Sequence, residues 1–171
     1  RFKSNLAKPY HKIGGKTLLE ISITKISKIK QIREIVLVYA KRDIYKIKKL
    51  KIKNVKLVAG GSNRQTSTYN ALKYLIQKKT FSKVLIHDAA RPNFSKKLLQ
   101  IIIKKMNKAR AVIPKLDICD AIKQKFESSK YEYIIAKDRN NMFLTQTPQA
   151  FNLKEIYNLH KNFSSRYRDD D

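Results

Sequence analysis

The residues best suited to chemistry follow a short apolar run that ends at His87. Asp88 comes next, followed by two alanines, Arg91 and Pro92. A carboxylate at the carboxyl end of a strand can hold a divalent metal over a cleft, and a guanidinium can bind phosphate through two parallel hydrogen bonds. The alanines leave room for a ligand. An ordinary alternative is that Asp88 caps the next turn and pairs with Arg91, and the residues alone leave both interpretations open.

A glycine pair marks a second candidate site. Gly60 and Gly61 follow the apolar run at residues 55–59 and lead through residues 62–67 into a segment with helical spacing. Adjacent glycines let a ligand approach the backbone, and the first turn of a helix offers unpaired N–H groups and the positive end of its dipole. These features suit a nucleotide. A tight turn with a Ser or Thr helix cap explains them equally well.

Two further polar segments are less specific. Asp138-Arg139-Asn140 is followed by Thr147 and Pro148, and hydroxyls with a guanidinium around a proline turn can form a pocket wall. Turn chemistry alone also explains this segment. Near the start of the chain, Lys8 could neutralise a phosphate, but physical arguments cannot select it among so many lysines.

The elements that must position these residues alternate between strand and helix. Short runs rich in β-branched residues predict buried strands at 35–40, 55–59, 83–87 and 111–113. Apolar residues at helical spacing predict helices around residues 18–26, 69–76 and 98–103. This alternation predicts an α/β fold with a mostly parallel sheet flanked by helices, and ligands bound beyond the carboxyl ends of the strands. With 171 residues, of which 42% are hydrophobic, we expect a single domain over residues 1–171.

Residues 121–136 interrupt the alternation. The sequence from Ala121 to Phe126 alternates between apolar and polar residues, a turn-like segment follows, and residues 131–136 are again of extended character. This pattern predicts an inserted β-hairpin. A two-stranded hairpin is marginally stable alone, so we expect its apolar residues to be covered by a second subunit.

The basic composition raises the question of nucleic-acid binding, since the net charge is +26 and the pI is about 10.2. A nucleic-acid site concentrates cations on one face among stacking aromatic residues. Here lysines occur in every segment, which is the bias that an AT-rich genome imposes on any surface. We therefore interpret most of them as solvated residues that help to attract phosphorylated substrates, and we expect no specific nucleic-acid partner.

The remaining composition favours a cytoplasmic protein without a membrane partner. No apolar run is long enough to cross a bilayer, and no signal peptide with a small-residue cleavage site occurs. The single cysteine, Cys119, excludes an internal disulfide and fits a reducing compartment. We expect Cys119 to be a small buried residue on a strand.

Together these segments resemble the 2-C-methyl-D-erythritol 4-phosphate cytidylyltransferase family over nearly the whole chain. The sequences His-Asp-Ala-Ala-Arg-Pro at residues 87–92 and Gln-Thr-Pro-Gln-Ala-Phe at 146–151 are highly specific signatures of that family. Lys-Pro-Tyr at residues 8–10 and Gly60-Gly61 with Arg64 and Ser67 occur in the expected order. The resemblance implies a Rossmann-like nucleotidyltransferase fold with a dimerisation arm. It also implies CTP and methylerythritol phosphate as substrates, pyrophosphate as a product, magnesium as the cofactor and a homodimer.

The resemblance further implies a role for each matched residue. The catalytic group would comprise Arg1, Lys8 and Arg139, of which the first two stabilise the transition state on the triphosphate. The nucleotide would contact Gly61, Ser62, Ser67 and Ala89. Asp88 would bind the magnesium ion. The methylerythritol phosphate would be held by Arg91, Thr147 and Arg139, the last reaching across from the partner's arm.

The sequence also departs from the family pattern. Ser62 stands where the family often has an acidic residue, and Ala121 stands where it usually has Thr, which removes a hydroxyl near the substrate. A glycine-rich phosphate loop is expected just before Arg1, and a substrate-positioning Lys is expected after Asp171. In some bacteria a cyclodiphosphate synthase is fused to this enzyme.

Three alternatives stay open at this point. The first is a cytidylyltransferase of the same fold for a pentitol phosphate such as ribitol 5-phosphate, although the paired alanines after Asp88 favour methylerythritol phosphate. The second, from another class, is a basic RNA-binding module, which the scattered cations oppose. The third is an inactive copy, which the presence of Lys8, Asp88, Arg91 and Arg139 opposes.

Overall fold

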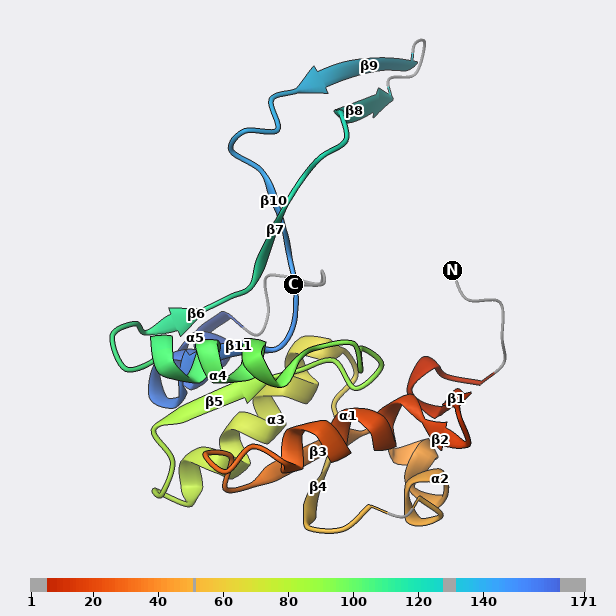
Figure 1. Ribbon diagram of the computed structural model, residues 1–171, viewed down its shortest axis with the longest axis vertical. Coiled ribbons are helices and arrows are strands. Elements are labelled where there is room, and N and C mark those ends of the chain that lie inside the picture. Colours follow the sequence, from red (N-terminus) through yellow and green to blue (C-terminus); the bar gives the residue numbers. More distant parts are fainter. Residues whose placement is uncertain (1–5, 51, 128–131, 164–171) are drawn as a thin grey trace.

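The computed structural model describes residues 6–50, 52–127 and 132–163. They form a body of strands and helices from which a long, thin arm projects (Figure 1).

Five described strands of the body form two sheets, and all four strands predicted from the sequence are among them. β3 (Ile35–Tyr39) and β4 (Val55–Ala59) pair in parallel. β5 (Lys83–Ile86), β11 (Gln149–Asn152) and β6 (Ala111–Val112) pair antiparallel in the order β5-β11-β6, because β11 carries the chain back from the arm.

An ion pair reveals how the two sheets are oriented. Arg64, which lies after β4, contacts Asp88, which lies after β5. The carboxyl ends of β4 and β5 therefore meet at one edge of the body, and β3, which is parallel to β4, ends at the same edge. Ligands of α/β sheets bind at such an edge.

A cavity of about 720 Å³ lies between β3 and β5. Among the described residues, β3 pairs only with β4 and β5 only with β11, so their facing edges have no strand partner. The cavity is lined in part by apolar side chains of three helices, including Leu19, Ile23, Leu72, Leu75, Leu99 and Ile103.

Four longer helices cover the strands: α1 (Leu18–Ser27), α3 (Arg64–Gln77), α4 (Lys96–Lys105) and α5 (Leu153–Phe163). α1 and α4 lie on the near side in Figure 1, while α3 and α5 pack together on the far side. α1 begins with a capping box, in which the Glu20 N–H donates to Thr17 Oγ1 (3.1 Å) and the Thr17 N–H donates to Glu20 Oε2 (2.8 Å). No described helix combines the length and the apolar character needed to cross a membrane.

The apolar residues that predicted α1, α3 and α4 contribute to the core. Leu19 and Ile23 of α1 pack with Leu37 of β3, and Leu99 of α4 packs with Phe94. The structure adds shorter elements that the spacing did not predict. They are η1 (Lys8–Tyr10), β1 (Lys12–Ile13), β2 (Lys16–Thr17), η2 (Lys41–Asp43) and α2 (Ile44–Lys48).

The arm consists of two strand pairs. β7 (Lys115–Asp117) pairs with β10 (Phe143–Thr145) near the body, and β8 (Ile122–Glu127) pairs with β9 (Glu132–Lys137) at the far end (Figure 1). The hairpin predicted at residues 121–136 is present, and the arm is longer than predicted because the flanking strands also pair. Its exposed apolar side chains include Leu116, Ile134, Ile135, Phe143 and Leu144.

Cys119 corrects one expectation from the sequence. It lies between β7 and β8, outside any strand, and it is exposed rather than buried. The reason is that the thin arm has no interior in which a side chain could be buried.

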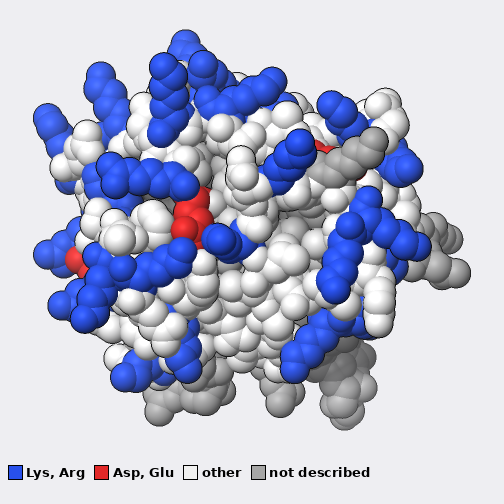
Figure 2. Space-filling model, turned by 90° about the horizontal axis from the view of Figure 1, so that it is seen from below, with Lys and Arg blue, Asp and Glu red and all other residues white. Residues whose placement is uncertain are grey.

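The basic side chains are spread over the surface, as the sequence predicts. On the face seen in Figure 2, Lys and Arg side chains are spread over the left, upper and right parts, some of them beside acidic residues, and uncharged surface lies between them.

Candidate functional site

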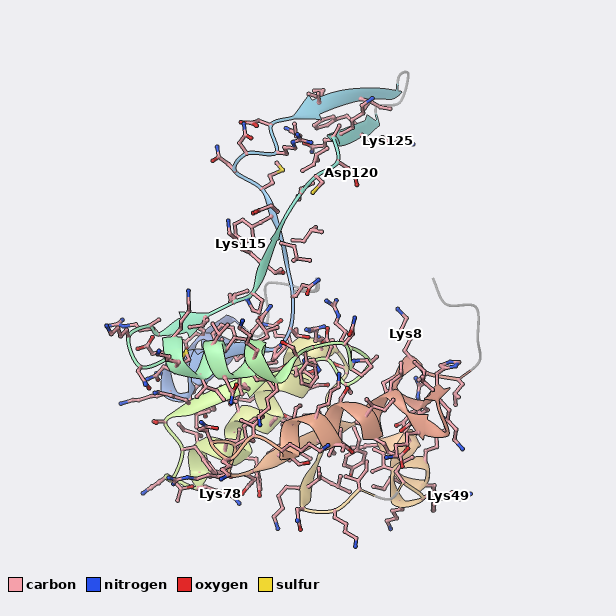
Figure 3. All side chains as sticks on the ribbon, in the orientation of Figure 1. Lys8, Lys49, Lys78, Lys115, Asp120 and Lys125 are labelled. Atoms are coloured by element: carbon pink, nitrogen blue, oxygen red, sulfur yellow. The ribbon has the colours of Figure 1, made fainter. Side chains whose placement is uncertain are left out.

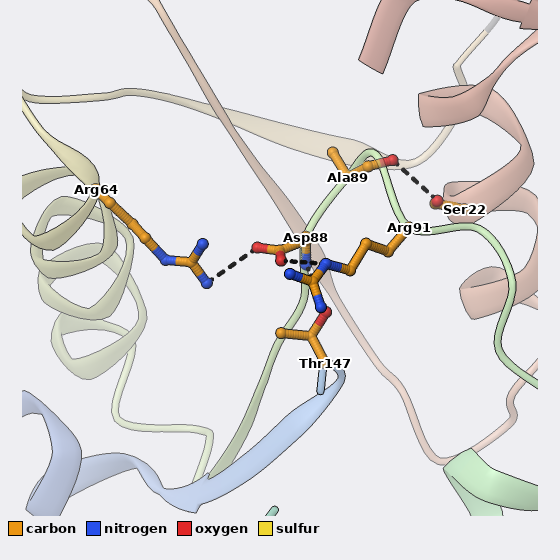
Figure 4. Close-up of polar contacts among 6 residues, drawn as sticks. All are labelled: Ser22, Arg64, Asp88, Ala89, Arg91 and Thr147. Atoms are coloured by element: carbon orange, nitrogen blue, oxygen red, sulfur yellow. Dashed lines mark hydrogen bonds and ion pairs between the residues drawn. The ribbon is translucent and has the colours of Figure 1, made fainter. Parts of the chain in front are cut away.

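Asp88 lies between two arginines at the carboxyl edge of the body (Figure 4). Its Oδ1 accepts from Arg64 Nη2 at 3.0 Å, and its Oδ2 accepts from Arg91 Nε at 2.9 Å. The pairing with Arg91 that the sequence suggested is therefore present. The pairing with Arg64 was not anticipated, because Arg64 belongs to α3 and only the packing of the two sheets brings it to Asp88.

The loop after β5 is anchored to neighbouring elements. Ser22 Oγ of α1 donates to the Ala89 carbonyl at 3.0 Å (Figure 4). Lys25 Nζ, one turn further along α1, donates to the carbonyls of Pro92 (2.7 Å) and Phe94 (3.2 Å). Ser22 and Lys25 share a helix face, but nothing in their sequence context indicates that they hold this loop.

Thr147, which lies between β10 (Phe143–Thr145) and β11 (Gln149–Asn152), reaches the same loop. Its hydroxyl accepts a hydrogen bond from the Asp88 N–H at 3.3 Å, and the side chain is buried. The two signatures, at residues 87–92 and 146–151, therefore meet in the folded chain. Thr147, which the sequence singled out in a separate segment, therefore joins Asp88, Ala89 and Arg91 in one cluster.

His87 precedes Asp88 and faces the interior. Its ring packs edge-to-face against Phe94 with the ring centroids 4.7 Å apart. Burial lowers the pKa of His87 below its usual value, so the imidazole is neutral at physiological pH. His87 therefore contributes packing rather than positive charge to the site.

The glycine pair forms a turn that is tied to the start of α3. The Gly60 N–H donates to the Tyr39 carbonyl at 2.8 Å, and the Gly61 N–H donates to Ser67 Oγ at 3.0 Å. A Cβ atom on Gly61 would overlap the side chain of Thr66, so only glycine fits there. The helix cap is Asn63, whose Oδ1 accepts from the Thr66 N–H at 2.8 Å, rather than the Ser or Thr considered from the sequence.

This turn lies beside the Asp88 cluster, because Arg64 is the first residue of α3. Ser62 is exposed at the turn, while the Ser67 hydroxyl is used within it. The capped tight turn that the sequence offered as an alternative is therefore present, with Asn63 as the cap. The turn is built as a helix entry, and it presents exposed backbone next to the arginines.

Lys8 belongs to a segment that is fixed through Tyr10. Tyr10 hydrogen-bonds to Asp43 of η2, and Lys46 Nζ lies 5.3 Å from the centroid of the Tyr10 ring. Burial, together with the charge of Asp43, raises the pKa of Tyr10 to about 12, so the phenol stays protonated and keeps this bond. Figure 3 places Lys8 on the side of the body that faces the arm and Lys49 on the opposite side. Arg1, the other residue assigned to the triphosphate, lies outside the described residues.

Arg139 is not part of this cluster. Its Nη1 donates to the Cys119 carbonyl on the opposite chain segment of the arm. Asp120, which follows Cys119 in the chain, lies well out along the arm in Figure 3. Within one chain, Arg139 is therefore remote from Asp88.

With Asp88 as its one carboxylate, the cluster suits a divalent metal ion that takes most of its ligands from a substrate. No group of three or more His, Cys, Asp or Glu side chains suited to a metal occurs among the described residues. Mg²⁺ is commonly bound through one or two carboxylates together with substrate phosphates and water. Asp88 offers one such carboxylate, and the adjacent cations offer partners for the phosphates.

The family model described as "IspD: 2-C-methyl-D-erythritol 4-phosphate cytidylyltransferase" matches residues 1–170. The chain belongs to this family. The "Bifunctional enzyme IspD/IspF" of Pelagibacter ubique is 44% identical over 170 residues, covering 99% of this chain and 44% of that protein. The 2-C-methyl-D-erythritol 4-phosphate cytidylyltransferase of Clostridium kluyveri is 37% identical over 176 residues, covering 96% of this chain and 72% of the relative. The chain thus spans less than half of the bifunctional relative.

Solved structures agree with the family assignment. The crystal structure of 4-diphosphocytidyl-2C-methyl-D-erythritol synthase from Anaerococcus prevotii superposes with a TM-score of 0.82 at 33% identity, covering 97% of this chain and 73% of that chain. The bifunctional IspDF of Campylobacter jejuni has a TM-score of 0.77 at 24% identity, which supports the fold alone. The α/β nucleotidyltransferase fold expected from the sequence is confirmed.

Proposed function

We propose that this chain transfers a cytidylyl group from CTP to 2-C-methyl-D-erythritol 4-phosphate and releases pyrophosphate. The observation that carries the proposal is the position of Asp88, held between Arg64 and Arg91 beside the Gly60-Gly61 turn. A carboxylate flanked by guanidiniums at the edge where α/β sheets bind ligands suits a triphosphate and a divalent ion.

The reaction needs positioning and charge stabilisation rather than a covalent intermediate on the protein. A phosphate oxygen of the alcohol phosphate forms a bond to the α-phosphorus of CTP. The bond from this phosphorus to the bridging oxygen breaks, and pyrophosphate leaves with the electron pair. Cations that face the growing negative charge lower the barrier.

The residues of the cluster divide between the two substrates in this proposal. Lys8 and Arg1 neutralise the triphosphate, and the turn with Gly61, Ser62 and Ser67 contacts the nucleotide together with Ala89. Arg91 and Thr147 hold the methylerythritol phosphate. Asp88 would hold Mg²⁺, which when bound would neutralise charge on the phosphates.

The arm supplies the remaining residue through a homodimer. Its exposed apolar side chains need a cover, and an equivalent arm of a second subunit offers a matching one. Arg139 would then reach the Asp88 cluster of the partner, since its own cluster is remote. We place the protein in the cytoplasm, where the exposed thiol of Cys119 stays reduced.

An assay of pyrophosphate release tests the proposal and its nearest rival. Protein with Mg²⁺ and CTP is supplied with methylerythritol phosphate or with ribitol 5-phosphate at equal concentration. We expect pyrophosphate and the cytidylylated product only with methylerythritol phosphate. Turnover with ribitol 5-phosphate alone would transfer the assignment to a pentitol phosphate, and turnover with neither would refute the proposal.

A further inference from the structure

Arg64 is the part of the cluster to which neither the sequence nor the family resemblance gave a role. It is the first residue of α3, and its Nη2 lies 3.0 Å from Asp88 Oδ1. Because Arg91 Nε occupies Oδ2 at 2.9 Å, each oxygen of the carboxylate already has a cationic partner. The carboxylate that the reaction needs for a metal is thus fully engaged by arginines.

Exposure shows which groups meet an incoming ligand first. The side chain of Asp88 is 20% exposed, whereas those of Arg64 and Arg91 are 39% and 51% exposed. The guanidiniums therefore lie toward solvent and the carboxylate lies beneath them. Two arginines and one carboxylate also leave the cluster with a net positive charge. A free divalent cation that approaches Asp88 is repelled by both guanidiniums.

We propose that the arginine pair is exchanged for the metal when the nucleotide arrives, and that Arg64 is a triphosphate-binding residue. In the free protein Asp88 holds Arg64 in place. When CTP and a divalent ion bind together, the ion takes the carboxylate and Arg64 moves onto the phosphates. This inference rests on the proposed function, because it takes the triphosphate of CTP as the ligand.

In this exchange the guanidinium and the carboxylate each lose one partner and gain another of suitable chemistry. A guanidinium binds phosphate oxygens as well as carboxylate oxygens, through the same pair of N–H groups. Mg²⁺ prefers oxygen ligands and accepts one carboxylate plus phosphates. The metal and the nucleotide therefore help each other to bind, since the phosphates remove the cations that repel the ion. Such mutual enhancement is reciprocal by thermodynamic linkage.

The test is to measure metal and nucleotide binding separately in Arg64→Met. Mn²⁺ serves as the probe, and it is added to metal-free protein in the absence of nucleotide. The electron paramagnetic resonance signal of free Mn²⁺ then reports how much of the ion the protein has bound. Removing one repelling cation should tighten Mn²⁺ binding at least about fivefold. Calorimetry with CTP at saturating Mg²⁺, without methylerythritol phosphate, should show CTP binding at least about fivefold weaker, because the phosphate partner that the ion releases from Asp88 is lost.

Arg110→Met is the matched control, because Arg110 is highly exposed on the surface and pairs with Glu155 at 3.6 Å. It should leave both affinities unchanged. Arg64→Gln, checked with Arg64→Met by circular dichroism, provides a second variant if the first fails to fold. Mn²⁺ affinity that is unchanged, weaker or undetectable in the folded variant would overturn the exchange. Neither measurement involves turnover or methylerythritol phosphate, so this inference and the proposed reaction can fail independently.

Discussion

The loop after β5 and the arm are built in opposite ways. The loop is tied down at several points by the rest of the body, through Ser22 and Lys25 of α1, Arg64 of α3 and Thr147 before β11. The arm is two strands wide, and its apolar side chains are left exposed. Its arginine, Arg139, donates to the Cys119 carbonyl of the arm itself.

This difference shows which parts of the site one subunit can assemble. The residues proposed to bind the metal and the triphosphate around Asp88 lie together before any ligand binds, because several elements of the same chain hold them there. Such preorganisation is what a phosphoryl-type transfer requires. Arg139 on the arm is not held by other elements of its own chain in this way. Its proposed contribution to an active site therefore depends on a surface outside the chain.

Asp88→Asn should show that the body carries the chemistry. We expect turnover to fall by about 10²-fold or more, because the neutral amide binds the divalent ion poorly and metal charge stabilisation is worth several kcal/mol. Pyrophosphate release measures the loss. Asp117→Asn, at an exposed carboxylate of the arm, is the control and should remain active. Near-normal turnover of Asp88→Asn in a folded protein would contradict the assignment.

Lys8→Ala should separate a positioned cation from the general basic surface. The segment that holds Lys8 is fixed through Tyr10 and Asp43, whereas Lys49 lies on the opposite side of the body. We expect kcat/KM to fall about tenfold for Lys8→Ala and to change little for Lys49→Ala or Lys104→Ala. Steady-state kinetics with CTP as the varied substrate provides the comparison. Equal effects of the three substitutions would instead favour a diffuse electrostatic field.

Mixing two inactive variants tests whether the arm acts on a partner. Asp88→Asn and Arg139→Ala should each be impaired, and subunit exchange should restore activity. In a heterodimer with two-fold symmetry, one composite site carries both changes and the other carries neither, so at most about half of its sites are intact.

Exchange must be verified in that experiment by a pull-down with differently tagged subunits. The variants kept apart serve as the reference for residual activity. If tagged subunits do exchange and no activity returns, Arg139 serves its own subunit and the arm has another role.

Lys25→Met should have the smallest effect, because it loosens the loop without removing a reacting group. The ammonium makes two hydrogen bonds to loop carbonyls, and their loss should lower Tm by about 3 °C. We expect kcat/KM to fall about threefold through a less ordered Asp88. Lys28→Met, at the exposed end of the same helix, is the matched control. A Tm equal to that of Lys28→Met would show that the loop does not depend on this anchor.

Much of the architecture could be predicted because local patterns carry it. The β-branched runs predicted β3, β4, β5 and β6, and the helical spacing predicted α1, α3 and α4, since burial on one face imposes a period on the chain. The helix α5 and the strands β7, β10 and β11 were not predicted. They are short or lie beside the signature at residues 146–151, where the polar and proline residues indicate a turn rather than a strand.

The sequence by itself determined the family, the chemical types of the site residues and the elements on which they lie. It placed Asp88, Arg91 and Thr147 in signatures whose composition is specific enough to identify without coordinates. Only the tertiary structure decided which of these residues meet. Arg64 reaches Asp88, Ser22 reaches Ala89, and Arg139 stays on the arm because packing of the helices on the strands sets those distances. Such contacts join residues far apart in the chain, so no local pattern records them.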